Sequence, residues 1–229
     1  MQSSAIDHYA MLRNVSRTFA LSIEQLPPIL RETITVAYLL FRIADCIEDH
    51  PVLTREHKAR LLRLWAEVLS GTAPVQSFTL KIEHLDGNNP EVAVAQQAGS
   101  IMERLHLLPV EPAGILAHHV QATSLGMARW QEHGPYVQDE AEMDDYMHEV
   151  AGRVGYLLTD VFSWHVPAIR RHRDTLLPLG REFGLALQTV NIIRGMRKDY
   201  ERGWVFVPVS FYTRAGLSRD GLFDPAQAD

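Results

Sequence analysis

The residues best suited to chemistry lie between positions 38 and 49, where the chain reads YLLFRIADCIED. Residues three and four apart share one face of a helix. Such a face would carry a tyrosine, an arginine and two carboxylates: Tyr38, Arg42, Asp45 and Asp49. Carboxylates of this kind, with Glu48 beside them, hold Mg²⁺ when substrate phosphates supply further ligands. The stretch therefore predicts either a magnesium-dependent site or a solvated acidic helix end with a surface arginine pair.

A second polar stripe is expected between positions 182 and 202, in EFGLALQTVNIIRGMRKDYER. Steps of three, four and four place these positions on one helix face: Gln188, Asn191, Gly195 and Asp199. Amides and a carboxylate on an otherwise apolar helix indicate the wall of a cavity. Cations gather towards the end of the same segment: Arg194, Arg197, Lys198 and Arg202. Either the helix dipole, which favours cations at a C-terminus, or an anionic ligand explains them.

Two glycines interrupt a third helical pattern, YMHEVAGRVG, at positions 146–155. Each costs roughly 1 kcal/mol relative to alanine in a helix. Gly152 and Gly155 therefore indicate close helix packing or the close approach of a ligand. Tyr146 stands two turns earlier, and we interpret it either as a hydroxyl aimed into the same space or as a half-buried ring with a hydrated tip.

Long segments with helical periodicity must position these stripes. They are expected at about 6–26, 28–48, 54–70, 91–108, 112–133, 140–165 and 170–200, with a break near Pro178. Residues 72–90 are expected to form a loop or a short hairpin, because DGNNP is a strong turn signal, and the tail after GWVFVP is expected to be irregular. We predict one all-α domain over residues 1–229, built from long antiparallel helices.

Composition and charge limit the partners and the cellular compartment that we expect for this protein. A net charge of −6 without a long basic block argues against nucleic acid as a partner. The single cysteine, Cys46, excludes an internal disulfide and is typical of a reducing compartment. The first residues lack the features of a signal peptide, and no apolar stretch approaches the ~20 residues of a spanning helix. These features predict a cytoplasmic protein, with room for a peripheral membrane contact.

Six segments together resemble the squalene/phytoene synthase family. They are SRTFALSI at 16–23, YLLFRIADCIED at 38–49, LGMARW at 125–130, YMHEVAGRVG at 146–155, ALQTVNIIR at 186–194 and GWVFVP at 203–208. Each is weak alone, but they occur in the family's order and cover most of the chain. Phytoene synthases usually carry an aspartate three residues after Met127, which this chain lacks. The resemblance therefore favours the squalene-synthase-like branch.

The resemblance implies an isoprenoid-synthase-type helical bundle around a central cavity. It also implies head-to-head condensation of two farnesyl diphosphates to a C30 product of the presqualene diphosphate or squalene type. The implied metal ligands are Asp45, Glu48, Asp49 and Asp199. The implied catalytic residues are Tyr38, Arg42 and Tyr146. The implied substrate contacts are Ser16, Arg17, Phe19, Gln188, Asn191 and Arg194.

Mg²⁺ is the cofactor that the resemblance implies, and squalene synthases add a final reduction by NADPH. The chain lacks a glycine-rich dinucleotide motif, but the family does not use one, so NADPH use stays open. The choice between C30 and the C40 product of phytoene synthases depends on cavity depth, which the sequence does not give. The oligomeric state is equally open.

The second acid motif of the family, usually DxxED or DxxxD, reads GMRKD here. Gly195 stands where the first aspartate belongs and Lys198 where a glutamate is common, so only Asp199 remains. Three interpretations follow. The basic residues neutralise diphosphate directly, the protein performs part of the reaction, such as ionisation or hydrolysis, or the chain is a non-catalytic relative with a prenyl-lipid pocket.

A second departure concerns length. Catalytic domains of the family usually continue with further helices after the segment that matches GWVFVP, whereas this chain stops at Asp229. Those helices help to wall the cavity. We therefore expect a C-terminally shortened bundle. Either a C-terminal portion lies outside this sequence, or the pocket is more open than in relatives.

Overall fold

The computed structural model describes residues 7–224, and the side chain of Arg17 lies outside the described part. Its α-helices are α1 (His8–Val15), α2 (Arg17–Glu24), α3 (Pro28–Asp49), α4 (Arg55–Leu69), α5 (Val75–Ile82), α6 (Pro90–Gln96), α7 (Ala98–Leu107), α8 (Val110–His133), α9 (Glu140–Met147), α10 (Arg153–His165), α11 (Pro167–Arg170), α12 (Arg173–Glu201) and α13 (Val209–Arg214). A π-helix, η1 (His148–Gly152), joins α9 to α10, and a 3₁₀ turn, η2 (Gly221–Phe223), follows α13. In this part of the chain β pairing is limited to one parallel bridge, Tyr136–Val205. The all-α prediction is confirmed.

Local residues explain where several helices begin and end. Pro28 occupies the first turn of α3, where a missing N–H costs nothing. The Thr54 hydroxyl caps α4 by accepting a hydrogen bond from the His57 backbone N–H at 3.3 Å. Gly71 follows the last turn of α4 with φ of 75°, a left-handed conformation that favours glycine. These residues fix the ends of α3, which carries the first polar stripe, and of α4, which packs on α3.

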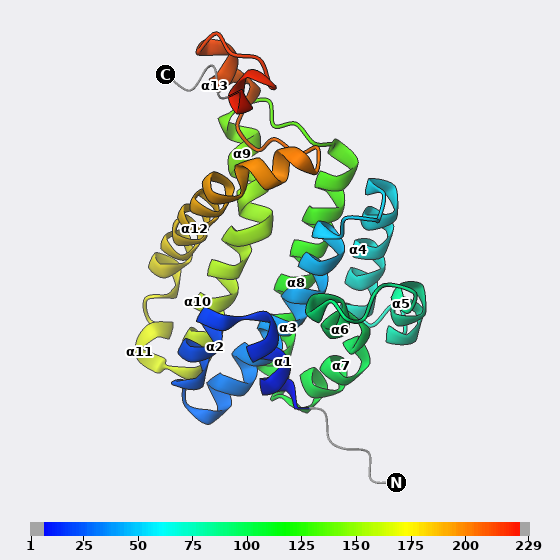
Figure 1. The fold of residues 1–229 in the computed structure, drawn as a ribbon. Helices are drawn as coiled ribbons and strands as arrows, with labels where there is room; N and C mark the ends of the chain where they lie inside the picture. Colours follow the sequence, from blue (N-terminus) through cyan, green and yellow to red (C-terminus); the bar gives the residue numbers. More distant parts are fainter. Residues whose placement is uncertain (1–6, 225–229) are drawn as a thin grey trace.

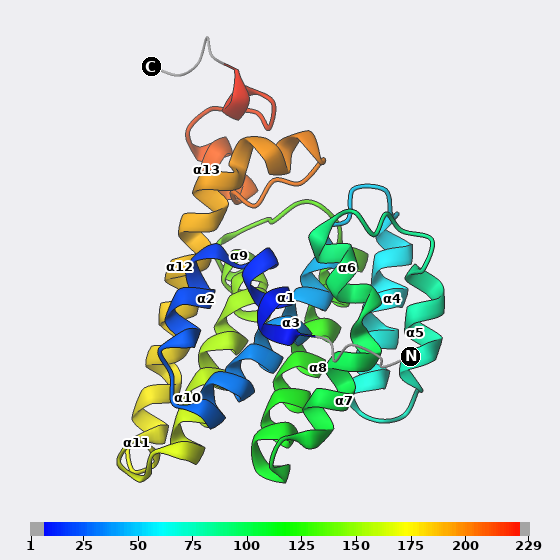
Figure 2. The same ribbon diagram turned by 60° about the horizontal axis from the view of Figure 1, so that its bottom comes forward.

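The central helix of the bundle is α3, with α8 beside it (Figure 1). The helices α4 and α6–α8 pack on α3, and α4 makes its most extensive contact with α8. After the short α11, α12 runs back alongside α10 (Figure 2). The pair α10–α12 therefore forms a second group of helices, joined to the first through the contact of α10 with α8.

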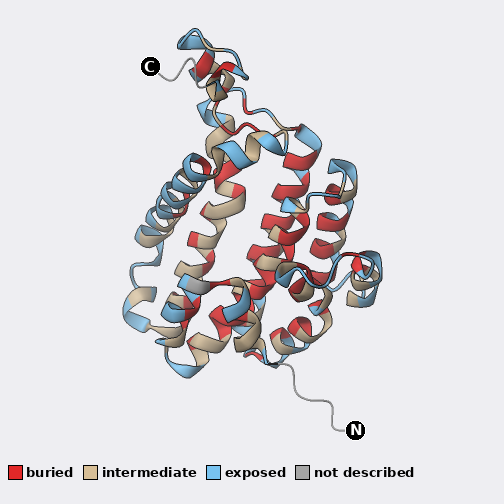
Figure 3. Ribbon diagram, viewed as in Figure 1, coloured by how far each residue is buried: buried red, intermediate tan, exposed pale blue. Residues whose placement is uncertain are grey.

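The hydrophobic core centres on α3, α4 and α8 (Figure 3). Five apolar residues of α3 are fully buried in it: Leu39, Leu40, Ile43, Ala44 and Ile47. Cys46 is buried as well, as a small hydrophobe. A smaller cluster gathers Trp130, Tyr146 and Phe206. By contrast, α12 buries only Gly184, Leu185 and Ile192 among its residues.

Several predicted boundaries were wrong. Residues 72–90 contain α5, because Phe78 and Ile82 are one helical turn apart and both are fully buried. The Phe78 ring packs on Trp65 with ring centroids 5.1 Å apart. The segment 91–108 is two helices that meet at Gln97. The tail is less irregular than predicted, since it contains α13 and η2.

Two further long segments also differ in detail. The expected helix at 6–26 is divided at Ser16, whose backbone is extended. The expected break at Pro178 is absent, and α12 continues through it. A proline inside a helix removes one backbone hydrogen bond. Beyond the proline, α12 packs closely on α10 and η1 at Gly180 and Gly184.

Candidate active site

The polar stripe of α3 faces a large cavity, because the opposite side of the helix is committed to the core. The cavity has a volume of about 1320 Å³, above the roughly 300–1000 Å³ of ordinary small-molecule pockets. All four stripe residues line it: Tyr38, Arg42, Asp45 and Asp49. Of the two interpretations of this stretch, this placement favours the functional site over the solvated acidic helix end.

The cavity wall changes in character along the helices. Apolar side chains from α2, α3, α10 and α12 line one section: Phe19, Ile34, Phe41, Leu158, Phe162, Phe183 and Leu187. Charged side chains gather where α3 and α12 end: Asp45, Glu48, Asp49, Arg55, Lys58, Lys198, Asp199 and Arg202. One space can therefore take a molecule with a long apolar part and an anionic head.

Arg42 is held in place by neighbours on both sides of the stripe. It donates through Nη2 to the Tyr38 hydroxyl at 2.7 Å and through Nη1 to Glu91 Oε1 at 3.1 Å. The Tyr38 hydroxyl in turn donates to the carbonyl oxygen of Val15 at 3.2 Å. The Asp45 carboxylate lies 3.8 Å from Arg42 Nη1. The guanidinium is thereby fixed with one side towards Asp45.

Two carboxyl groups of α3 lie in surroundings that disfavour their charged form. Loss of contact with water raises the pKa of Asp45 to about 6, although Arg42 opposes the shift. The Asp45 side chain is 36% exposed, and it lies on the cavity wall. Burial and the neighbouring Asp49 raise the pKa of Glu48 well above its ordinary value. A bound cation would relieve both groups.

Lys58, from the first turns of α4, is a buried cation at this end of the cavity that sequence reasoning missed. Its Nζ donates to the backbone carbonyl of Glu48 at 2.6 Å, and it lines the cavity. Burial lowers the pKa of this lysine. No spacing in the sequence indicates the contact, since it depends on how residues 50–54 return the chain over the end of α3.

The second stripe also reaches the cavity. Gln188, Asn191 and Asp199 line the wall formed by α12, and Asn191 Nδ2 donates to Gln188 Oε1 at 3.3 Å. Asp199 is paired with Arg202, whose Nη1 also donates to Asp49 Oδ1 at 2.7 Å. Arg202 therefore joins the two acidic walls, a link between residues 153 positions apart.

Tyr146 stands between these walls. Its ring is buried, stacks on Phe206 with centroids 4.3 Å apart and meets Trp130 edge-on at 5.4 Å. The hydroxyl makes no hydrogen bond to another residue within 7–224, and Tyr146 lines the cavity. Burial, and then the acidic residues of both walls, raise the pKa of this phenol well above its ordinary value. Its hydroxyl therefore stays protonated at neutral pH.

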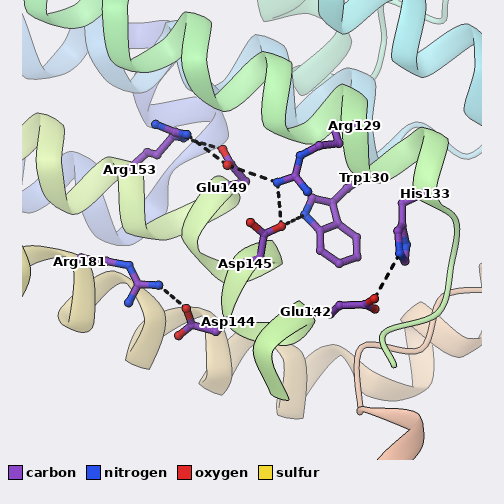
Figure 4. A network of polar contacts seen from close by, with 9 residues as sticks. All are labelled: Arg129, Trp130, His133, Glu142, Asp144, Asp145, Glu149, Arg153 and Arg181. Carbon is purple, nitrogen blue, oxygen red and sulfur yellow. Dashed lines mark hydrogen bonds and ion pairs between the residues drawn. The ribbon is translucent and has the colours of Figure 1, made fainter. Parts of the chain in front are cut away.

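A polar network joins the segment that carries Tyr146 to its neighbours, with side chains from α8, α9, η1, α10 and α12 (Figure 4). Asp145 accepts hydrogen bonds from Arg129 Nη2 at 2.7 Å and from Trp130 Nε1 at 2.9 Å. Glu149 accepts from Arg153 Nε at 2.5 Å and from Arg129 Nη2 at 3.4 Å. These contacts tie α9 and η1 to α8. Two more pairs extend the network: Asp144–Arg181 and Glu142–His133.

The glycines of the third motif serve close helix packing. A Cβ at Gly155 would lie 2.0 Å from the backbone oxygen of Gly180, and a Cβ at Gly184 would lie 2.4 Å from that of Ala151. The backbones of α10 and η1 therefore touch that of α12 directly. Gly155 also lines the cavity, so this packing brings the α12 stripe to its wall.

The remaining predicted substrate contacts differ in whether they reach the cavity. Phe19 lines the cavity, and its ring centroid lies 6.1 Å from that of Tyr38. Ser16 is buried at the junction of α1 and α2, and its hydroxyl has no partner in the described part of the chain. Arg194 is exposed, and it is not among the cavity-lining residues. The predicted contact of Arg17 falls on a side chain outside the described residues.

Metal binding by protein groups alone is not supported in the described residues. Within 7–224, no three acidic, histidine or cysteine side chains are grouped so as to hold a metal ion. The four predicted ligands share the cavity, but Asp49 and Asp199 are each paired with Arg202. Mg²⁺ commonly needs only one or two carboxylates when phosphates supply other ligands. The oxygen donors of α3 thus fit a metal that binds together with a diphosphate.

The sequence also matches a known protein family. The sequence profile described as squalene/phytoene synthase matches residues 12–229. The chain belongs to the squalene/phytoene synthase family. Squalene synthase ERG9 of Saccharomyces cerevisiae is 32% identical over 217 residues, which cover 90% of this chain and 46% of the yeast protein. Human squalene synthase is 26% identical over 217 residues, covering 93% of this chain and 49% of the human protein.

Solved structures show the same fold. The structure of TcSQS with the ligand E5700 superposes with a TM-score of 0.80 at 25% identity, covering 96% of this chain and 62% of that one. The complex of TcSQS with BPH1237 gives a TM-score of 0.79 at 24% identity. The chain spans about half the length of the curated relatives it matches. None of the helices in the described residues is long and apolar enough to cross a membrane.

Proposed function

We propose that this protein catalyses the head-to-head condensation of two farnesyl diphosphates to a C30 product of the presqualene diphosphate or squalene type. The observation that carries the proposal is a single cavity that joins an apolar section to a charged end with the carboxylates of α3. Its volume of about 1320 Å³ suits two long prenyl chains better than one small ligand. The squalene synthases among its relatives support the same reaction class.

In the first step, the C1–O bond of one farnesyl diphosphate breaks and diphosphate leaves with the electron pair. Fixed positive charge near the leaving group lowers this barrier. Arg42 and Lys58 supply such charge at the end of α3. Asp45, Glu48 and Asp49 would hold Mg²⁺, with Asp199 on the opposite wall. When bound, this ion neutralises further charge on the diphosphate.

In the second step, the allylic cation adds across the C2–C3 double bond of the second substrate and loses one proton. From two farnesyl diphosphates, the two steps together yield one cyclopropyl diphosphate, one free diphosphate and one proton. Apolar residues such as Phe41 and Leu158 keep water from the cation. Since the Tyr146 hydroxyl stays protonated, we assign it as a hydrogen-bond donor rather than a base. Tyr38 orients Arg42, and Phe19, Gln188 and Asn191 contact substrate.

Reduction of the cyclopropyl intermediate to squalene would require NADPH as hydride donor. Use of NADPH, and the C30 rather than C40 product, are parts of the proposal that analysis of the lipid products with and without NADPH decides. We further propose a cytoplasmic protein that meets its amphiphilic substrates, and releases an apolar product, through peripheral membrane contact. Exposed apolar residues beside the cavity, such as Phe19 and Phe183, motivate this contact.

The direct test of the site is Asp45→Asn, assayed by Mg²⁺-dependent release of diphosphate from farnesyl diphosphate. We expect loss of at least about two orders of magnitude in rate, because electrostatic stabilisation of the developing charge usually contributes most to catalysis in such reactions. Glu103→Gln is the matched control, since Glu103 is an exposed carboxylate of α7 away from the cavity. Equal diphosphate release by Asp45→Asn and the unchanged protein would refute the assignment.

A second candidate is a protein that binds prenyl diphosphates, or hydrolyses them, without coupling. The pairing of Asp49 and Asp199 with Arg202, next to Gly195 and Lys198, favours it. This candidate predicts farnesyl diphosphate binding with no Mg²⁺-dependent C30 product. Detection of such a product excludes it.

A further inference from the structure

Arg202 lies where the acidic ends of α3 and α12 meet, and its guanidinium is a positive charge that the protein itself supplies. Its Nη1 donates to Asp49 Oδ1 at 2.7 Å, and its Nη2 donates to Asp199 Oδ1. Asp49 ends α3, whereas Asp199 lies in the last turn of α12. A guanidinium thus joins the two helices where a metal would otherwise have to balance both carboxylates.

The residue at position 195 allows this arrangement. A Cβ at Gly195 would lie 3.2 Å from Asp199 Oδ2, a tight contact. Without a side chain there, the Asp199 carboxylate can lie back along α12 and reach Arg202. An aspartate at the same position would bring a second carboxylate beside Asp199 and compete for the guanidinium. The absence of a side chain at Gly195 and the pairing of Asp199 with Arg202 therefore go together.

Two more cations face the same end of the cavity. Lys58 contacts the last turn of α3 through the carbonyl of Glu48, next to the residue that Arg202 contacts. Lys198 lines the cavity from α12 and makes no ion pair with another residue in the described range. Arginine forms bidentate hydrogen bonds to phosphate, and lysine binds it as a point charge. All three cations thus line the same cavity, Lys58 from α4 and Lys198 and Arg202 from the end of α12.

We infer that Lys58, Lys198 and Arg202 form a diphosphate-binding subsite that works without metal, beside the metal-assisted site of α3. The ligand class is the diphosphate head of a prenyl substrate, so the inference rests on the proposed function. On binding, the anion takes the guanidinium of Arg202 and leaves the Asp49 carboxylate free. Metal and diphosphate are thereby divided, with the metal on the carboxylates of α3 and Asp199 and the diphosphate on the cations of α4 and α12.

The test measures the binding of inorganic diphosphate to the 229-residue chain in excess EDTA by isothermal titration calorimetry. We expect measurable binding without metal. Arg202→Gln and Lys198→Gln should each weaken it by about 10–100-fold, the range for charge-assisted hydrogen bonds. Arg197→Gln is the matched control, because it removes the same charge from the same helix end outside the cavity. Its affinity should equal that of the unchanged protein.

The choice of variants distinguishes a loss of binding from a loss of folding. Arg202→Gln leaves two carboxylates unpaired, so its thermal unfolding is recorded alongside. Lys198→Gln breaks no ion pair within residues 7–224, and a loss of binding in this variant reports on the subsite alone. Binding only in the presence of Mg²⁺, or equal affinities in all three variants, would overturn the inference.

Product formation separates this inference from the proposed function. If the protein makes the C30 product but does not bind diphosphate in EDTA, the inference is wrong and the function stands. If it binds diphosphate in EDTA through Arg202 and Lys198 but makes no product, the subsite stands as an anion site and the proposed condensation is wrong.

Discussion

At the scale of residues, two arginines determine what the acidic stripe can do. Arg42 lies on the stripe and is fixed by Tyr38 and Glu91. Arg202 comes from the far end of the chain and closes the stripe at Asp49. Asp45, between them, keeps a raised pKa in spite of Arg42. The carboxylates are therefore positioned but only partly neutralised, which suits the arrival of a further cation.

Metal affinity should depend on pH through Asp45. A metal ion binds the deprotonated carboxylate, so protons compete with it. With the pKa of Asp45 at about 6, affinity should fall by about tenfold per pH unit below pH 6 and level off above pH 7. Binding of Mn²⁺, a paramagnetic ion that also takes oxygen ligands, can be followed by EPR between pH 5 and pH 8. Asp45→Asn should bind more weakly at pH 8 and flatten the profile, whereas equal affinity of the unchanged protein at both ends contradicts the assignment.

Tyr146 should matter for rate more than for stability. Tyr146→Phe keeps the stack on Phe206 and removes a hydroxyl that has no partner within residues 7–224. We expect a change of less than about 1 kcal/mol in the free energy of unfolding. The rate of diphosphate release should fall by about a hundredfold, as for loss of one preorganised donor. Tyr212→Phe, at a buried tyrosine of α13 outside the cavity, is the control that should leave the rate unchanged.

At the scale of elements, the cavity exists because α10 and η1 touch α12 without side chains between them. Three glycines make the contact: Gly155, Gly180 and Gly184. The network of Asp145 and Glu149 fixes the same segment to α8 (Figure 4). The distance between the two polar stripes is thus set by backbone contact on one side and by ion pairs on the other.

Gly155→Ala tests this packing. Its Cβ would lie 2.0 Å from the Gly180 oxygen, so the helices must separate. Overpacking of this kind costs about 1–3 kcal/mol in the free energy of unfolding. Gly114→Ala is the control, because Gly114 lies in α8 with nothing within 4 Å of the added Cβ. It should stabilise the protein by about 0.5–1 kcal/mol. Urea unfolding measures both, and equal midpoints for the two variants would show that the glycine contact is unimportant.

Periodicity identified the long helices and the two stripes, because both depend on residues close in sequence. The four residues of the α3 stripe all reach the cavity for this reason. Contacts between distant segments were not predictable. The Arg202–Asp49 pair and the Lys58–Glu48 contact depend on the packing of whole helices. The π-helix at His148–Gly152 has no sequence signal beyond two glycines, and α5 was missed because its two buried residues resembled an alternating pattern.

At the scale of the molecule, the bundle brings one large cavity together with an exposed flank. Five large apolar residues on α12 are exposed, at 45–65%: Leu179, Phe183, Leu187, Val190 and Ile193. Phe183 also lines the cavity, so the flank is continuous with its wall. The fold matches solved structures over 96% of this chain but only 62% of theirs. Whether the walls present in this chain suffice for condensation is the central question.

One measurement answers it most directly. Purified protein is incubated with farnesyl diphosphate and Mg²⁺, with and without NADPH, and the extracted lipids are analysed by mass. We expect a cyclopropyl C30 diphosphate without NADPH, and a C30 hydrocarbon when NADPH is added. Farnesol alone, above an enzyme-free control, or no turnover at all would contradict the proposed condensation.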